Sequence, residues 1–574
     1  MTHRSAPLAT ALLLSLAACG SGTKDDAGGG RIVGDAAPTN DAGEGANVDA
    51  PDDSGPLVVP RAIAPLSTSR VTSRRPTLRW VLPSGVTDAT VDLCLDRACT
   101  APIGAPAHVT GSSYAPLADL PVGVVFWRLH PSTAKGISSP TWQFTVPARS
   151  AKVDSSWGTT LDMNGDGYAD VVIGAPGVNN VGAAYVFTGS RTGLANAPAA
   201  TLLGLGEDYP GFGWAVASAG DVNGDGLADV AIATRGDGGS CVYIYLGDAD
   251  ALPITPTTTI CPPLTVFSDG DLSVSSAGDV NGDGYADLVV AGGGAVAYVY
   301  LGSARGLDPA SPTPLTGPFV ANLAGIIGAG AGDVNGDGFG DVVVAASYFA
   351  PSGFVGGNYV YLGHAAGIDT APSSTLAGGA LPSGGGSFFN MNIASAGDVN
   401  GDGYADLLAG ACDKPDCAFV YLGSAAGVVA TPATTLTAPG GLGGIVALAS
   451  AGDVNGDGYG DVAVGTDSAS NPVVSIYLGG ASGLAARPAS APSEPGSMVD
   501  GFGFAFASAG DVNGDGFADL VVGAEDGDPS DPASVNGSAY VFLGSATGVA
   551  ASPKITLQGP ETGDFGASVF GASN

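Results

Sequence analysis

The chain has 574 residues, of which 45% are hydrophobic and only 13% charged, and its formal net charge is −35. Its 93 glycines and 40 prolines favour short strands and tight turns over helices, because both residues are unfavourable inside a helix. A chain this acidic repels phosphates, which excludes nucleic acid as a partner.

The first residues have the pattern of an export signal. Arg4 precedes the short apolar segment LATALLLSL (8–16), which is too short to span a bilayer, so we predict a signal peptide over residues 1–18. The sequence LAAC ending at Cys19 resembles the lipobox of bacterial lipoproteins. This resemblance implies lipidation of Cys19 and a membrane partner through the lipid anchor, and Gly20 after it implies the outer membrane or cell surface of a bacterium. The alternative is an ordinary signal peptide in which Cys19 is incidental.

Residues 19–56 follow as a lipidated cysteine and a linker of Gly, Ala and Asp with hardly any large apolar residue. Such a segment cannot bury enough apolar surface to offset the entropy lost on ordering, so we predict a disordered acidic linker.

Residues 57–148 differ from this linker in composition. They contain four strand-like runs, PTLRWVL, TVDLCLD, VVFWRLH and TWQFTV, separated by Pro and Gly, and three core anchors, Trp80, Trp127 and Trp142. Short strands at this spacing predict a small β-sandwich, weakly similar to fibronectin type III or immunoglobulin-like modules.

An arginine cluster lies in the same segment, at Arg70, Arg74, Arg75 and Arg79. We expect a solvated face, paired with the acidic repeats described below; contact with anionic headgroups or sugars is the alternative.

Six further cysteines fall into three local pairs, Cys94–Cys99, Cys241–Cys261 and Cys412–Cys417. In an exported protein we predict three disulfides. A zinc site is the rival interpretation, but CLDRAC and CDKPDC lack the two-residue gaps and the histidines of zinc knuckles.

The rest of the chain is one repeat. The pattern Asp-x-Asn-Gly-Asp-Gly-x-x-Asp begins at Asp162, Asp221, Asp279, Asp333, Asp398, Asp453 and Asp511, at intervals of 54 to 65 residues. The seventh unit shows the plan: a strand (502–510), the loop (511–519) and three more strands (520–524, 538–544 and 555–559). Four short strands repeated seven times predict an all-β fold with a seven-bladed β-propeller over residues 149–574.

This unit resembles the FG-GAP repeat of integrin α-subunit propellers. The FG dipeptide occurs as Phe212-Gly213, Phe502-Gly503 and Phe565-Gly566, and a full GAP occurs as Gly174-Ala175-Pro176. Other units depart from the FG and GAP sequences, but the acidic loop is intact in all seven.

The last FG predicts how the ring closes. Phe565 lies nine residues before Asn574, as Phe502 lies nine before Asp511, whereas the segment 153–161 is a poor first strand. We therefore expect FGASVFG (565–571) to pair into the first blade.

Each loop offers side-chain oxygens at positions 1, 3, 5 and 9 and a backbone carbonyl at position 7. Hard oxygen ligands in this number suit Ca²⁺, and the Gly at position 6 permits the sharp turn around the ion. The predicted ligands are Asp162, Asn164, Asp166, Tyr168 and Asp170; Asp221, Asn223, Asp225, Leu227 and Asp229; Asp279, Asn281, Asp283, Tyr285 and Asp287; Asp333, Asn335, Asp337, Phe339 and Asp341; Asp398, Asn400, Asp402, Tyr404 and Asp406; Asp453, Asn455, Asp457, Tyr459 and Asp461; and Asp511, Asn513, Asp515, Phe517 and Asp519.

We expect about seven structural calcium ions. An EF-hand or a dockerin would need flanking helices, and position 12 falls instead in a strand, as Val290 does in LVVAG. Without cations each loop crowds three carboxylates that must repel one another, so a structural role accounts for the pattern.

Resemblance to integrin α-subunits implies adhesion or recognition of an unknown protein or glycan ligand. The alternatives are an extracellular polysaccharide- or lipid-directed enzyme, or a lectin, on the same propeller. No HExxH, GxSxG or P-loop motif occurs, and we assign no catalytic residue.

Overall fold

The structure is a computed structural model that divides into two units, Met1–Pro56 and Leu57–Asn574. It describes residues 59–573 apart from 66, 68, 132–136, 148–149, 152–155, 158, 205–210, 236–239, 263–271, 293–295, 318–322, 351–352, 377–387, 413–416, 437–443, 468–472, 495–500, 526–536 and 561–562. The predicted signal peptide, Cys19 and the linker lie outside these residues. Within them, no helix has the length and apolar character needed to cross a bilayer.

The fold is all-β, as predicted, and the single helical element of the described residues is the short 3-10 turn η1 (Val178–Asn180).

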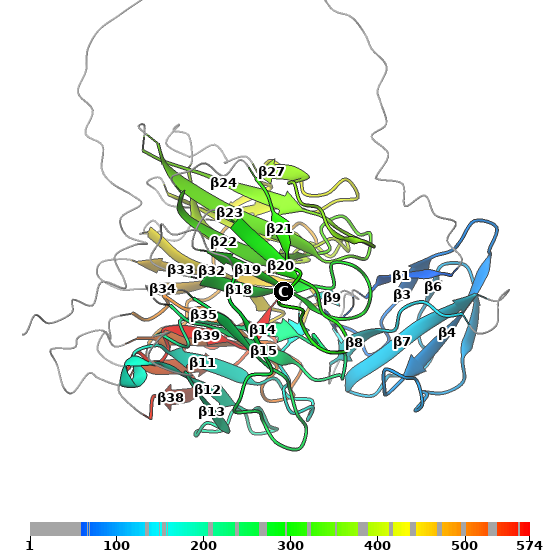
Figure 1. Cartoon of the computed structure of the whole chain (residues 1–574), viewed down its shortest axis with the longest axis horizontal. Coiled ribbons are helices and arrows are strands. Elements are labelled where there is room, and N and C mark those ends of the chain that lie inside the picture. The colour runs from blue at the N-terminus through cyan, green and yellow to red at the C-terminus, as the bar shows by residue number, and fades with distance from the viewer. Residues whose placement is uncertain are drawn as a thin grey trace, which may run out of the picture. The chain divides into compact units, whose positions relative to one another are not determined.

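The N-terminal region, which we define as residues 59–148, forms two sheets (Figure 1). One contains β1 (Arg61–Ala64), β3 (Leu78–Val81) and β6 (Ser113–Tyr114). The other has the order β5 (Ala107–Thr110), β4 (Asp88–Cys94), β7 (Gly123–Pro131), β8 (Trp142–Val146), β2 (Ser69–Val71) and β9 (Ser156–Trp157), so that β9 joins it from beyond the predicted boundary at residue 148.

The three predicted tryptophan anchors are all buried in one core shared by these two sheets. Trp80 comes from the smaller sheet and Trp127 and Trp142 from the larger, and the last two rings meet edge to face with centroids 6.1 Å apart. These tryptophans therefore hold the two sheets together.

Within its described residues, the repeat region, residues 149–574, contains seven antiparallel sheets of three or more strands, numbered here 1 to 7 in chain order. Sheet 1 contains β11 (Val171–Ala175), β12 (Ala183–Phe187), β13 (Ala200–Leu203) and β39 (Ser568–Phe570); sheet 2 contains β14 (Ala215–Gly220), β15 (Asp229–Ala233), β16 (Val242–Tyr245) and β17 (Thr258–Ile260); and sheet 3 contains β18 (Leu272–Gly278), β19 (Asp287–Gly292), β20 (Val296–Tyr300) and β21 (Thr313–Leu315). Sheet 4 contains β22 (Leu323–Gly332), β23 (Asp341–Ala350), β24 (Gly353–Tyr361) and β27 (Ser374–Leu376), and sheet 5 contains β28 (Phe388–Gly397), β29 (Asp406–Cys412), β30 (Cys417–Tyr421) and β31 (Thr434–Leu436). Sheet 6 contains β32 (Gly444–Gly452), β33 (Asp461–Asp467) and β34 (Val473–Tyr477), and sheet 7 contains β35 (Phe506–Gly510), β36 (Asp519–Ala524), β37 (Ser538–Phe542), β38 (Ile555–Gln558), β40 (Ala572–Ser573) and β10 (Thr159–Thr160). A two-stranded hairpin, β25 (Gly363–His364) and β26 (Gly367–Ile368), follows β24.

Neighbouring sheets pack face to face through seven apolar clusters. The second strand of a sheet is covered on both faces, which is why runs such as LVVAG in β19 are continuously apolar and fully buried. One cluster joins sheet 7 to sheet 1, with Val521 and Val541 against Ile173 and Tyr185. The packing of the sheets therefore forms a closed cycle.

The predicted closure by the C-terminal segment is confirmed. Strand β39 pairs with β11 in sheet 1, with Val569 opposite Ile173 (Figure 1). Phe565 is fully buried, and its ring centroid lies 5.6 Å from that of Tyr185 and 6.2 Å from that of Phe187. The last FG dipeptide thus anchors the end of the chain to the first sheet.

Candidate metal centre in seven acidic loops

The seven acidic loops are numbered 1 to 7 in chain order. Loops 2 to 7 each connect the first strand of a sheet to its second, whereas loop 1 connects β10 of sheet 7 to β11 of sheet 1. In loop 3 the preceding strand β18 ends at Gly278, and Asp287 at position 9 already opens β19. Gly282 and Gly284, at positions 4 and 6, have φ angles of 70° and 91°, which strain any residue with a Cβ. The sequence Asn-Gly-Asp-Gly therefore dictates the tight course of the loop.

The loop carboxylates organise their own backbone. In loop 3 the Asp279 carboxylate accepts the N–H groups of Asp283 (3.1 Å) and Gly284 (2.6 Å). The Asn281 side chain donates to Asp283 Oδ2 at 3.0 Å, and Asp283 Oδ1 accepts the N–H of Tyr285 at 3.0 Å. The side chains at positions 1, 3 and 5 are thus gathered on the inside of one turn.

The aspartate at position 9 fastens the loop to the third strand of its sheet. Asp287 is fully buried; its Oδ2 accepts the N–H of Val280 at 2.8 Å and its Oδ1 accepts the N–H of Gly302 at 2.7 Å. Every loop repeats this pair of bonds, and the glycine donors that follow the third strands are Gly189, Gly247, Gly302, Gly363, Gly423, Gly479 and Gly544. These glycines were not among the predicted site residues, although the repeated Leu-Gly or Thr-Gly after each third strand was the available signal.

Hydrogen bonds also connect each loop to the next. The N–H at position 8 donates to the carbonyl at position 1 of the preceding loop, as Ala286 does to Asp221 at 2.9 Å. The other donor–acceptor pairs are Ala228–Asp162, Gly340–Asp279, Ala405–Asp333, Gly460–Asp398, Ala518–Asp453 and Ala169–Asp511. Because loop 1 donates to loop 7, the seven loops form an unbroken ring of backbone hydrogen bonds.

Burial makes these carboxylates unusually hard to ionise. Burial first, and then the neighbouring loop carboxylates, raise the pKa of Asp279 to about 7 and that of Asp162 to about 6. At position 9 burial raises the pKa of Asp170 and Asp406 to about 8, and the pKa of Asp287 lies well above its ordinary value. Burial and mutual repulsion therefore disfavour the ionised form of these carboxylates as long as no cation is bound among them.

The donor chemistry fits a hard divalent cation such as Ca²⁺. Positions 1, 3 and 5 present side-chain oxygens and position 7 a carbonyl, and each carboxylate oxygen has a second lone pair beyond its backbone bond. Among the described residues, however, no group of three or more His, Cys, Asp or Glu side chains is placed to hold one metal ion together. Position 9 is turned to backbone N–H groups, so the ligand assignments stay predictions.

The predicted arginine cluster divides between two sets of partners. Arg70 Nη2 lies 3.5 Å from Asp511 Oδ2, the first carboxylate of loop 7. Arg75 Nε lies 2.7 Å and Arg74 Nη1 3.8 Å from Asp119 in the N-terminal region itself. The expected pairing with the acidic repeats thus holds for Arg70.

Two of the three predicted disulfides are confirmed, Cys94–Cys99 and Cys241–Cys261. The side chains of Cys412 and Cys417 lie outside the described residues.

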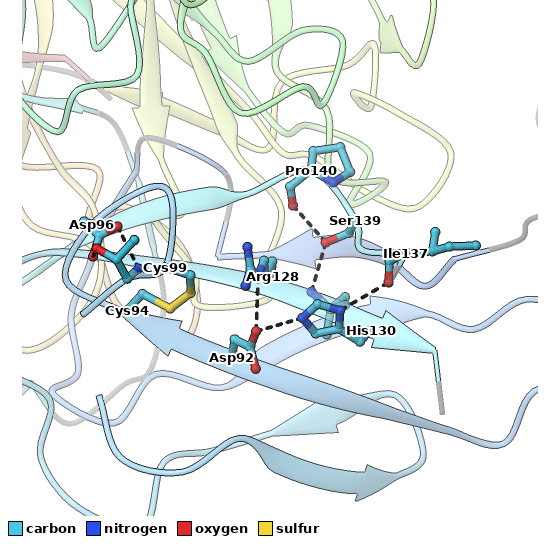
Figure 2. A network of polar contacts seen from close by, with 11 residues as sticks. Asp92, Cys94, Asp96, Cys99, Arg128, His130, Ile137, Ser139 and Pro140 are labelled. Carbon is cyan, nitrogen blue, oxygen red and sulfur yellow. Dashed lines mark hydrogen bonds and ion pairs between the residues drawn. A yellow bond between two sulfur atoms is a disulfide. The ribbon is translucent and has the colours of Figure 1, made fainter. Parts of the chain in front are cut away.

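A second polar cluster lies in the N-terminal region (Figure 2). Asp92 on β4 accepts a hydrogen bond from Arg128 Nε at 3.1 Å and lies 2.7 Å from His130 Nε2, and His130 Nδ1 lies 3.1 Å from the Ile137 carbonyl oxygen. Ser139 is nearby, but its hydroxyl bonds to backbone groups and not to His130. The cluster therefore lacks the nucleophile–base contact of a Ser-His-Asp triad and serves to join neighbouring strands.

Comparison with known proteins identifies the repeats. The FG-GAP-like repeat family matches residues 221–290, 279–344, 398–464 and 453–522, and the FG-GAP repeat family matches residues 156–187. Integrin alpha-IIb of Mus musculus is 37% identical over 195 residues, which are 29% of this chain and 19% of that protein. Integrin alpha-PS3 of Drosophila melanogaster is 33% identical over 156 residues, 24% of this chain and 14% of that protein. The chain thus matches less than a fifth of the length of these relatives.

Two solved structures are distantly similar to this chain. The exotype rhamnogalacturonan lyase YesX has a TM-score of 0.31 at 10% identity and covers 84% of this chain and 81% of its own. AofleA from Arthrobotrys oligospora has a TM-score of 0.32 at 11% identity, with 61% and 90% covered. Likenesses at this level carry no inference about activity.

Proposed function

Because the chain carries FG-GAP repeats similar to those of integrin α-subunits, we propose that it is a calcium-stabilised recognition protein of the cell surface. The repeat region is a seven-bladed β-propeller, and the N-terminal region is a β-sandwich placed before it. The lipid anchor at Cys19 and the acidic linker hold both outside the cell, at the outer membrane of a bacterium.

The observation that supports this proposal best is the closed ring of acidic loops. Each loop has the same oxygen donors, and the seven loops are joined without a break, so a cation in each supports the whole ring. An active site is normally present once, whereas these sites recur in every sheet. Their repetition favours a structural role for calcium, with recognition left to other surfaces.

Ligand binding is proposed for the end of the sheets opposite to the acidic loops. The N-terminal region touches loops 2, 3, 4 and 7. Gln143 Nε2 donates to Asp221 Oδ2 of loop 2 at 2.8 Å, and Arg97, Arg61 and Arg70 contact loops 3, 4 and 7. A protein or glycan ligand would have to displace these contacts to reach the loop end.

The first experiment counts calcium and measures its effect on stability. Calorimetric titration of the chelated protein is expected to give about seven sites, with affinities on the order of 10⁻⁴–10⁻³ M. Excess EDTA should lower the melting temperature by many degrees. An unchanged melt would refute structural calcium.

The second experiment tests recognition. The calcium-loaded protein is applied to glycan and cell-surface arrays, with the EDTA-treated protein as control, and saturable, EDTA-sensitive binding without turnover is expected. Absence of binding to every array would count against recognition.

Turnover of an arrayed polysaccharide would favour the alternative, an enzyme. Glu525 and Asp564, two acidic residues outside the loops, allow the enzyme alternative to be tested. Burial, and then the nearby Asp564, raise the pKa of Glu525 to about 7. Under the enzyme hypothesis Glu525→Gln would abolish turnover, whereas under the recognition hypothesis it leaves calcium binding and array binding intact.

A further inference from the structure

The N-terminal region covers the acidic loops unequally. A Cβ built on Gly167, at position 6 of loop 1, would meet nothing within 4 Å. On Gly284, the same position of loop 3, it would stand 2.7 Å from Arg97 Nη2, and on Gly338 of loop 4 it would stand 2.7 Å from the Cα of Ile63. Position 6 is therefore open in loop 1 and covered in loops 3 and 4.

Two arginines of the N-terminal region contact the acidic loops, Arg97 at loop 3 and Arg61 at loop 4. The half-buried Arg97 donates from Nη1 to the Gly284 carbonyl at 2.8 Å, and its guanidinium carbon lies 4.0 Å from the centroid of the Tyr285 ring. Arg61 donates from Nη1 to the Asp337 carbonyl and lies 4.7 Å from the centroid of the Phe339 ring. Each arginine thus touches positions 5 to 7 of its loop, the segment that contributes two of the predicted metal ligands.

The positive charges of Arg97 and Arg61 disfavour the binding of a cation to loops 3 and 4. A loop with three ionised carboxylates has a formal charge of −3, and a bound Ca²⁺ would reduce it to −1. The guanidinium is attracted to the empty loop and repelled by the ion.

Loop 1 provides an internal reference. Its sequence, DMNGDGYAD, differs from the DVNGDGYAD of loop 3 only at position 2. Among the described residues, no hydrogen bond, ion pair or ring contact joins loop 1 to the N-terminal region.

We propose that Arg97 and Arg61 make loops 3 and 4 bind calcium more weakly than loop 1, so that the loops fill in a set order and the filling of loops 3 and 4 loosens the N-terminal region. This inference rests on the proposed calcium binding. Because coupling between two binding events is reciprocal, the arginines lower calcium affinity by the same factor by which calcium weakens their contacts. A unit charge several ångströms from a divalent ion at a partly exposed site changes the affinity on the order of tenfold.

The test measures calcium affinity loop by loop. Hydrogen exchange followed by mass spectrometry is recorded on the full chain across a calcium titration, and the midpoint of protection is read from peptides covering loops 1 and 3. We expect the midpoint of loop 3 to lie about tenfold above that of loop 1. Arg97→Gln, which removes the charge but keeps a donor, should lower the loop 3 midpoint toward that of loop 1 and leave loop 1 unchanged. Arg97→Lys, which keeps the charge, should leave both midpoints in place.

The outcomes separate the two proposals. If no loop gains protection with calcium, the proposed calcium binding fails and this inference fails with it. If the loops are protected but Arg97→Gln leaves or raises the loop 3 midpoint, or Arg97→Lys shifts it equally, the inference alone is overturned. A melting curve verifies that each variant folds. If Arg97→Gln does not fold, the same comparison is made with Arg61→Gln and loop 4.

Discussion

Two adjacent glycines after β34 offer a direct test of the loop architecture. The Gly479 N–H donates to Asp461 Oδ1 at 2.8 Å, and a Cβ on Gly479 would stand 2.8 Å from the Tyr459 Cβ, 2.9 Å from the Val399 carbonyl oxygen and closer still to the carbonyl oxygen of Gly460. None of these atoms belongs to the free end of a side chain. A Cβ on Gly480 would meet nothing within 4 Å.

The expected cost of Gly479→Ala follows from these contacts. Forcing a methyl group into a filled site costs about 1–3 kcal/mol, and weakening a hydrogen bond to a carboxylate adds roughly 1–2 kcal/mol. We therefore expect a loss of about 2–5 kcal/mol of unfolding free energy. Gly480→Ala breaks no contact, and it should be neutral or stabilise by up to about 1 kcal/mol by restricting the unfolded chain.

Urea unfolding at a fixed calcium concentration, followed by circular dichroism, gives the comparison. The midpoint of Gly479→Ala should fall with an unchanged slope, while that of Gly480→Ala should stay at the wild-type value or rise. Equal midpoints for the two variants, or greater damage from Gly480→Ala, would refute the proposed packing of the loop against the end of the third strand.

Phe565→Ala should cost about 3–5 kcal/mol in urea unfolding because the ring is fully buried, whereas Leu117→Ala, at 90% exposure, should cost almost nothing; similar losses would contradict the closure by the C-terminal segment. Replacing Cys241 and Cys261 by serine opens a disulfide spanning 20 residues and should lower stability by roughly 3 kcal/mol, and a reducing agent that destabilises the variant as much as the wild type would argue against this bond. Chelated protein should become more stable as the pH falls from about 8 toward 4, because burial raises the pKa of residues such as Asp170, to about 8, so that the folded state binds more protons than the unfolded state in that window. Melting temperatures in EDTA between pH 5 and 8 test the sign, and a stability that rises with pH would contradict it.

The sequence predicted the elements whose signals are local. The Asn-Gly-Asp-Gly sequence indicates the turn of each acidic loop, and each buried second strand is an apolar run. The loop and the later strands of the seventh unit therefore lie close to where they were predicted, but the first strand, predicted over 502–510, begins only at Phe506. The pairing of β39 with β11 was also predicted, because the final FG dipeptide repeats a spacing found in complete units.

Long-range partners could not be predicted in this way. The sequence predicted Asp287 as one of five metal ligands in loop 3. Its hydrogen bonds to Val280 and Gly302 show that it also fastens the loop to the end of the third strand, a contact that depends on that strand's position. The contacts of Arg97 and Arg61 with loops 3 and 4 join parts of the chain that no local pattern relates. The sequence also placed a boundary at residue 148, whereas β9 continues the N-terminal sheet past it.

The closed ring of loops has one seam. Six of its backbone bonds join successive units, but the bond from Ala169 to Asp511 joins the first unit to the last. Bringing such distant segments together costs more chain entropy than any other step of assembly, so this seam should close last as the protein folds and part first when it is strained. Opening there would free β39 while the other six bonds persist, leaving a partly unwound but still folded array. Mechanical pulling or proteolysis should therefore begin at this one joint.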